Sequence, residues 1–126
     1  MRKLVFGCLF LCSCASSNLS LLSVTSQSWI GGRQETGSGT NYRIKLIAPE
    51  SNNYFHIQKV CIENVELNFN TLPKAFEKGD TVSLNGRKAT SHCSTLSIGV
   101  VHYQLKGCND SLIISNIQKL PQLFYP

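Results

Sequence analysis

The sequence predicts an all-β fold, an antiparallel immunoglobulin-like β-sandwich of about seven strands that follows an amino-terminal signal. Short runs of alternating apolar and polar residues recur about every ten residues, with turn-forming residues between them. No segment sustains the apolar spacing of an amphipathic helix between capping residues. These patterns favour antiparallel strands over helical or alternating α/β architectures.

The strands are expected where the alternation is clearest and where Gly, Pro or Asn bounds it. In residues 41–48, for example, Tyr42, Ile44 and Leu46 alternate with Arg43 and Lys45. The turn Glu63-Asn64 joins two alternating runs and predicts the clearest hairpin. The expected strands are residues 27–32, 41–48, 54–62, 65–69, 80–84, 95–105 and 112–117.

The segments between the strands also have predicted roles. The glycine-rich loop 31–39 lets the chain turn tightly, because Gly tolerates positive φ. Residues 71–79 are expected to cross one end of the fold and plug the core with Phe76, and Asn85-Gly86 is expected to end the fifth strand. A bulge is expected at Gly99, a turn at residues 106–110 and an apolar tail at residues 120–126.

The first fourteen residues have the layout of a bacterial secretion signal. Arg2 and Lys3 precede an apolar run that is too short to span a bilayer, and Leu11-Cys12-Ser13-Cys14 follows it. This junction resembles the lipobox of bacterial lipoproteins. The resemblance implies that residues 1–13 are removed and that the Cys14 thiol carries a diacylglycerol, so that residues 14–26 form a lipidated tether and residues 27–126 the domain.

Other fates of the signal stay open at this point. A plain cleaved signal would release a secreted protein. In a eukaryotic secretory protein, Asn18 and Asn109 would be glycosylation acceptors.

Charge gives little support for a nucleic-acid partner. The formal net charge is +5 and falls to about +3 without Arg2 and Lys3. Apart from Arg2-Lys3, the longest basic run is Arg87-Lys88, and aromatic residues do not alternate regularly with it.

The cysteines suggest a single bridge within the domain. If strands alternate in direction, Cys61 and Cys93 fall at the same end of the fold, whereas Cys93 and Cys108 flank a strand about 30 Å long. We therefore favour a Cys61–Cys93 disulfide, with three unpaired thiols as the alternative. No CxxC and no His pair has zinc-ligand spacing, so neither a metal nor another cofactor is expected.

Because the expected strands alternate in direction, their loops fall at two ends of the fold. The loops at the end farthest from the tether are predicted to form a contact surface. It would hold Arg33, Arg87, Lys88, His92 and Tyr125. The alternative is that these residues lie in ordinary solvated turns.

Catalytic chemistry is not expected. His92 and Cys93 are adjacent, which in an extended chain directs them to opposite sides. Gly37-Ser38-Gly39 lacks the strand-to-helix elbow of a catalytic serine and the features of a phosphate loop.

Three stretches resemble a group of small uncharacterised lipoproteins of Bacteroidota: Trp29-Ile30-Gly31-Gly32, Gly37-Ser38-Gly39-Thr40-Asn41-Tyr42, and the tail from Leu120-Pro121 to Tyr125-Pro126. In that phylum, exported surface lipoproteins usually carry acidic residues directly after the lipidated cysteine, and residues 15–18 contain none. The resemblance implies an outer-membrane anchor that faces the periplasm.

The sequence thus leads us to expect a non-catalytic binding or assembly accessory module with an envelope protein or a glycan as its partner. The alternatives are a purely structural envelope lipoprotein or, less favoured, a secreted hydrolase.

Overall fold

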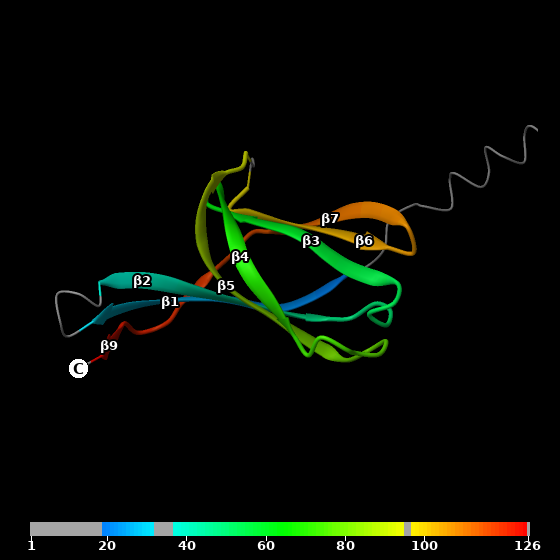
Figure 1. The fold of residues 1–126 in the computed structure, drawn as a ribbon, viewed down its shortest axis with the longest axis horizontal. Coiled ribbons are helices and arrows are strands. Elements are labelled where there is room, and N and C mark those ends of the chain that lie inside the picture. Colours follow the sequence, from blue (N-terminus) through cyan, green and yellow to red (C-terminus); the bar gives the residue numbers. More distant parts are fainter. Residues whose placement is uncertain (1–18, 32–36, 95–96, 126) are drawn as a thin grey trace, which may run out of the picture.

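The strands form one continuous hydrogen-bonded sheet that curls around a single core (Figure 1). The computed structural model describes residues 19–31, 37–94 and 97–125. The strands are β1 (Ser20–Gly31), β2 (Ser38–Ile47), β3 (Phe55–Ile62), β4 (Val65–Leu72), β5 (Thr81–His92), β6 (Gly99–Leu105), β7 (Cys108–Ile114), β8 (Gln118–Lys119) and β9 (Leu123–Tyr125).

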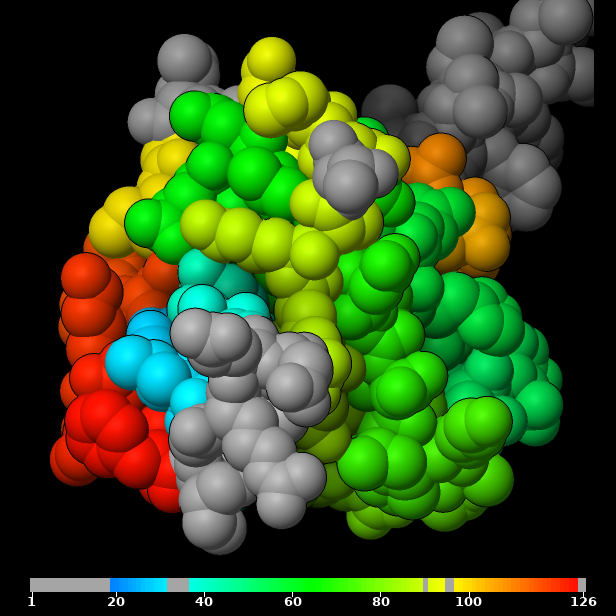
Figure 2. Space-filling model, turned by 60° about the vertical axis from the view of Figure 1, so that its left-hand side comes forward, coloured from blue at the N-terminus to red at the C-terminus, as the bar shows by residue number. Residues whose placement is uncertain are grey.

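The strand order in the sheet is β7-β6-β3-β4-β5-β2-β1-β8, and β9 also pairs with β1. All pairs are antiparallel except those of β8 and β9 with β1. Figure 2 shows the carboxyl-terminal segment, in red, packed beside β1, in blue. The all-β prediction is confirmed. The described strands are joined in one mixed sheet, because β5 pairs with β4 on one side and with β2 on the other.

The predicted limits of β1 and β5 are wrong. β1 begins at Ser20, so part of the segment assigned to the tether pairs with β2. Its inward side chains Val24 and Ser26 are buried, whereas Ser20, Ser23 and Thr25 lie on the opposite, at least partly exposed face, where polar side chains are tolerated. β5 does not end at Asn85-Gly86 but runs through it to His92.

Gly86 allows the two neighbouring strands to approach β5 closely. It lies opposite Tyr42 on β2 and opposite Phe69 on β4. A Cβ atom at this position would stand 2.7 Å from the Asn68 carbonyl oxygen and 2.9 Å from Phe69 Cβ. The glycine therefore serves packing between strands here rather than a turn.

Two tight hairpins account for other strand limits. Glu63 and Asn64 have φ of 54° and 66°, which confirms the predicted turn as one with two positive φ angles. Lys106 and Gly107, with φ of 51° and 82°, form a second such turn, so β7 starts at Cys108 rather than at residue 112.

The expected bulge at Gly99 is wrong. Gly99 pairs in register with Ile62 and with Ile114, and the irregularity between β3 and β6 lies between Ile57 and Lys59. A Cβ atom at Gly99 would stand 2.8 Å from the Cys61 carbonyl oxygen, so close strand approach explains this glycine.

The core lies on the inner face of the curled sheet, and the loop between β4 and β5 closes one end of it, as predicted. Phe76 from this loop is 6% exposed and meets Phe55 edge-on at 6.2 Å. Its backbone bonds to Asn52, so the β2–β3 loop and the β4–β5 loop lie together. The fully buried side chains of the sheet are Ile44, Leu46, Phe55, Val60, Cys61, Ile62, Val82, Leu84, Val101, Tyr103 and Ile114.

Cys61 and Cys93, the pair favoured from the sequence, form a disulfide with their Cα atoms 6.2 Å apart. Backbone bonds from Glu63 to the Ile98 carbonyl and from Cys93 to the Asn64 carbonyl reinforce this end. The bridge fastens the segment after β5 to the β3–β4 hairpin.

Candidate functional site

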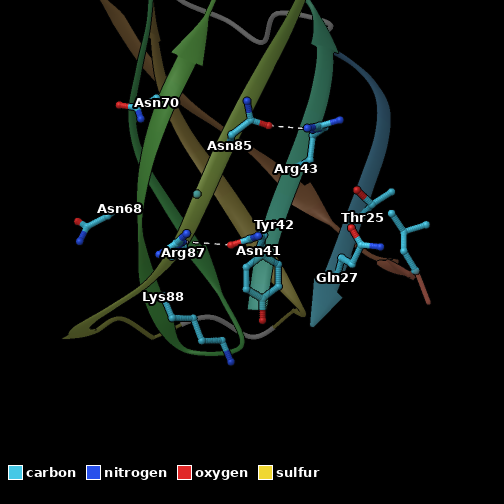
Figure 3. A pocket seen from close by; sticks show the side chains of 12 residues that line it. Thr25, Gln27, Asn41, Tyr42, Arg43, Asn68, Asn70, Asn85, Arg87 and Lys88 are labelled. Atoms are coloured by element: carbon cyan, nitrogen blue, oxygen red, sulfur yellow. Dashed lines mark hydrogen bonds between the residues drawn. The ribbon is translucent and has the colours of Figure 1, made fainter. Parts of the chain in front are cut away.

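The outer face of β1, β2, β5 and β4 carries polar side chains in ordered rows across the sheet (Figure 3). Residues in register across neighbouring strands make up each row. One row is Gln27, Asn41, Arg87 and Asn68, and the next is Thr25, Arg43, Asn85 and Asn70. These eight residues line a groove of about 670 Å³, which we call the outer groove.

Two reciprocal Arg–Asn pairs occupy the middle of the outer groove. Arg43 Nε donates to Asn85 Oδ1 at 2.9 Å, and Arg87 Nε donates to Asn41 Oδ1 at 3.1 Å. Both bonds cross the gap between β2 and β5 but in opposite directions, as the dashed lines in Figure 3 show. Each arginine is thus oriented by an amide on the neighbouring strand.

Trp29 supports the end of the outer groove. It lies opposite Gly39, where a Cβ atom would stand 2.9 Å from the indole nitrogen, so the ring covers the glycine. The Arg87 guanidinium carbon lies 5.7 Å from the centre of the same ring, a cation–π distance. Arg87 is therefore held by an amide on one side and by an indole on the other.

A second polar cluster lies on the inner side, where the core opens beside the β3–β4 turn. The Tyr42 hydroxyl donates to Glu63 Oε1 at 3.1 Å, and Lys88 Nζ lies 3.3 Å from the same oxygen. Burial and the hydrogen bond with Glu63 raise the pKa of Tyr42. The hydrogen bond from Tyr42 and the contact with Lys88 lower the pKa of Glu63.

Lys88 completes this inner cluster. Burial acts to lower the pKa of Lys88, but the charges of Tyr42 and Glu63 outweigh it, so the pKa is raised. The three side chains lie beside a hollow of about 400 Å³ that also includes Ser26 and Lys119.

The structure separates most of the predicted contact residues. Arg87 and Lys88 both border the outer groove, but Lys88, which faces the opposite way on β5, is paired with Glu63 in the inner cluster. His92 is the last residue of β5 and lies opposite Val65 on β4. Tyr125 pairs with Gly31 on β1, which is two strands away from β5 in the sheet. The predicted residues Arg33 and Cys14 lie outside the described residues.

The sequence reasoning missed most of the outer groove. A usable signal was present, because the tripeptide Asn-x-Arg occurs as Asn41-Tyr42-Arg43 and again as Asn85-Gly86-Arg87. Two such tripeptides on neighbouring antiparallel strands place each Asn opposite an Arg. Recognising the signal required knowing that β2 and β5 are neighbours.

Within residues 19–31, 37–94 and 97–125, no group of three or more His, Cys, Asp or Glu side chains could hold a metal ion. His56 shares a hollow of about 620 Å³ with Glu50 and Tyr54, and none of the described residues that line it is Ser or Cys. Across the same described part of the chain, no helix is long and apolar enough to cross a membrane.

No family model, no curated protein and no solved structure matches the chain.

Proposed function

We propose that the protein is a non-catalytic binding module of the cell envelope, anchored through lipid at Cys14 and facing the periplasm. The observation that carries the binding role is the pair of Arg–Asn contacts across the outer groove. Exposed arginines are ordinarily free to change rotamer, and fixing two of them in the unbound protein costs side-chain entropy. Such preorganisation is useful when a partner must be bound, because the ordering cost is met before binding.

Exposed apolar side chains at the tip of β1 and β9 support a binding role as well. Phe124 is 73% exposed and lies in register with Ile30, which is 39% exposed. Large apolar side chains grouped at a surface are typical of contact sites. A purely structural lipoprotein would need neither this tip nor the ordered arginines.

The anchor is tested by fractionating cells that express the protein or its Cys14→Ser variant while feeding them labelled palmitate. We expect label and membrane association for the parent, and loss of both together with retention of residues 1–13 for the variant. Equal processing and equal membrane association of the two proteins would refute the anchor.

The binding role is tested by chemical cross-linking in intact cells, followed by purification of the protein and analysis of attached protein and sugar. We expect the double variant Arg43→Ala/Arg87→Ala to lose the attached material. Lys74→Ala is the matched control, because Lys74 is exposed and lies outside the outer groove. Identical recovery from the parent and the double variant would show that the groove is not the binding site.

A further inference from the structure

The two arginines of the outer groove retain a part of the guanidinium group that can bind an anion. Each uses Nε for its bond to an asparagine. Within the described residues, no ion pair involves Arg43 or Arg87. Their terminal amino groups therefore remain available, and this planar fork matches a carboxylate or a sulfate.

The charge of the outer groove is positive. Arg43 and Arg87 belong to its lining, and Lys45 is exposed on the same face one row further along β2. No Asp or Glu is among the groove-lining residues in the described part of the chain. An anionic ligand is thus favoured over a neutral or a cationic one.

The remaining lining of the groove is suited to hydroxyl groups. Besides Tyr42, Gly86, Lys88 and Leu120, which border it, the groove holds four asparagines, one glutamine and one threonine. A carboxamide offers both donors and an acceptor, so a row of amides can bond to successive hydroxyls whichever way each hydroxyl points. Asn68 and Asn70 are exposed on β4 and extend this chemistry beyond the arginines.

Other acidic polymers fit the outer groove less well. Single-stranded nucleic acid requires aromatic faces on which bases stack. The indole of Trp29 is already covered by Arg87. Tyr42 borders the groove, but Lys88 Nζ lies over its ring at 5.9 Å and its hydroxyl is bonded to Glu63. An acidic peptide would favour apolar anchor pockets, whereas Leu120 is the one large aliphatic side chain among the described residues that line the groove.

We propose that the outer groove binds an acidic polysaccharide, with carboxylate or sulfate groups held by Arg43 and Arg87 and sugar hydroxyls held by the flanking amides. This inference rests on the proposed binding function and names its ligand class. The polymer lies across the middle of the groove, where the two arginines are diagonal neighbours on β2 and β5.

The experiment measures binding of the full chain, purified from cells in mild detergent, to five immobilised polymers. Polygalacturonate carries carboxylates, dextran sulfate carries sulfates and dextran is neutral, whereas polyglutamate and single-stranded DNA are acidic polymers of other classes. We expect binding to polygalacturonate, to dextran sulfate or to both, which identifies the preferred acid group, and no binding to dextran. We also expect weaker binding when NaCl is raised from about 0.05 M to about 0.5 M.

Two sets of variants locate the site. Arg43→Ala and Arg87→Ala should each weaken binding about tenfold, the usual effect of losing hydrogen bonds to a charged group. Asn70→Asp places a carboxylate in the groove with little change of shape and should weaken binding by a similar factor. Asn53→Asp, an exposed position outside the groove, adds the same charge and is expected to bind like the parent. Thermal unfolding of each variant checks that it is folded.

Each result has a defined meaning. Equal binding to polyglutamate or DNA, equal weakening by Asn70→Asp and Asn53→Asp, or absence of binding to both acidic polysaccharides would overturn the inference. If polysaccharide binding fails while groove-dependent cross-linking in cells persists, the binding function stands and only its ligand class is wrong. If cross-linking in cells does not depend on the groove, the proposed function fails, whatever the purified protein binds.

Discussion

Along β2 and β5, the inner and outer faces of the same strands have opposite surroundings. Inner residues such as Ile44, Leu46 and Val82 are at most 1% exposed and meet the core. Outer residues such as Arg43 and Arg87 are exposed and contact polar groups on the neighbouring strand. The inner face determines stability because its contacts are apolar and close-packed. The order of amides and guanidinium groups on the outer face is not required for folding, so it is the face on which a binding function can be built.

The largest expected effect separates the two faces directly. Leu46→Ala removes a side chain with no exposed surface and should lower the free energy of unfolding by about 2 to 5 kcal/mol. Lys45→Ala, the adjacent position on the outer face, should change it by no more than about 0.5 kcal/mol. Urea denaturation of both variants measures the difference, and comparable losses would show that the faces are not energetically distinct.

Cys61 provides a sharper form of the comparison, because it is an outward-pointing side chain that is nevertheless buried. Its neighbours Val60 and Ile62 point inward, and the bridge to Cys93 covers its outer side. Replacing both cysteines by Ala should cost about 3 kcal/mol, given the 32-residue separation. A double variant as stable as the oxidised parent would contradict this role.

Gly86 allows a test of how closely β4 and β5 must approach each other. Gly86→Ala introduces a methyl group 2.7 Å from a carbonyl oxygen and should destabilise the protein by about 1 to 3 kcal/mol. Asn85→Ala, which precedes it on the outer face, should cost about 0.5 kcal/mol or less. Thermal unfolding compares the two variants. A neutral Gly86→Ala would mean that β4 and β5 can separate without loss.

The smallest expected effect concerns the inner cluster and appears only in its pH dependence. The hydrogen bond from Tyr42 lowers the pKa of Glu63 below 4.5. A carboxylate whose pKa is lower in the folded state stabilises the fold above its unfolded pKa, and this stability is lost as the pH falls through the folded pKa. Tyr42→Phe removes the largest cause, so the pKa of Glu63 should rise and less stability should be lost in acid.

Carboxyl NMR titration of Glu63 measures this change, together with urea denaturation at about pH 7 and about pH 3. Tyr54→Phe is the control, because Tyr54 is 56% exposed and lies at the other end of the sheet. An unchanged titration of Glu63 in Tyr42→Phe would rule out the hydrogen bond as the cause.

Much of the fold could be predicted because alternation records burial on one face. Residues 41–48 and 54–62 gave nearly the limits of β2 and β3 for this reason. Asn85-Gly86 was wrongly predicted to end the fifth strand, because Asn-Gly is a strong turn signal. Here the neighbouring strands on both sides require a small residue at this position. Residues 20–26 were predicted to belong to the tether, because a Ser-rich strand with a solvated face resembles a linker in sequence.

The candidate site was less accessible to prediction than the fold. The prediction placed Arg87 and Lys88 on one contact surface, although adjacent residues of a strand face opposite ways. The groups that hold Arg87 in the outer groove come from β2 and β1, which are distant from it in sequence. Strand order and register, set by packing of the core, had to be known before these residues could be grouped.

Residues 118–125 have a consequence for self-association. β8 and β9 occupy the side of β1 that faces away from β2, and further bonds join Leu120 to Ser26 and Gln27 to the Pro121 carbonyl. Without them, a row of backbone donors and acceptors would be open to pair with another molecule. A chain shortened to end at Asn116 should therefore elute as dimers or larger species in size-exclusion chromatography, under conditions in which the parent remains monomeric. The carboxyl-terminal strands therefore cover the edge of β1 that would otherwise be open to strand pairing between molecules.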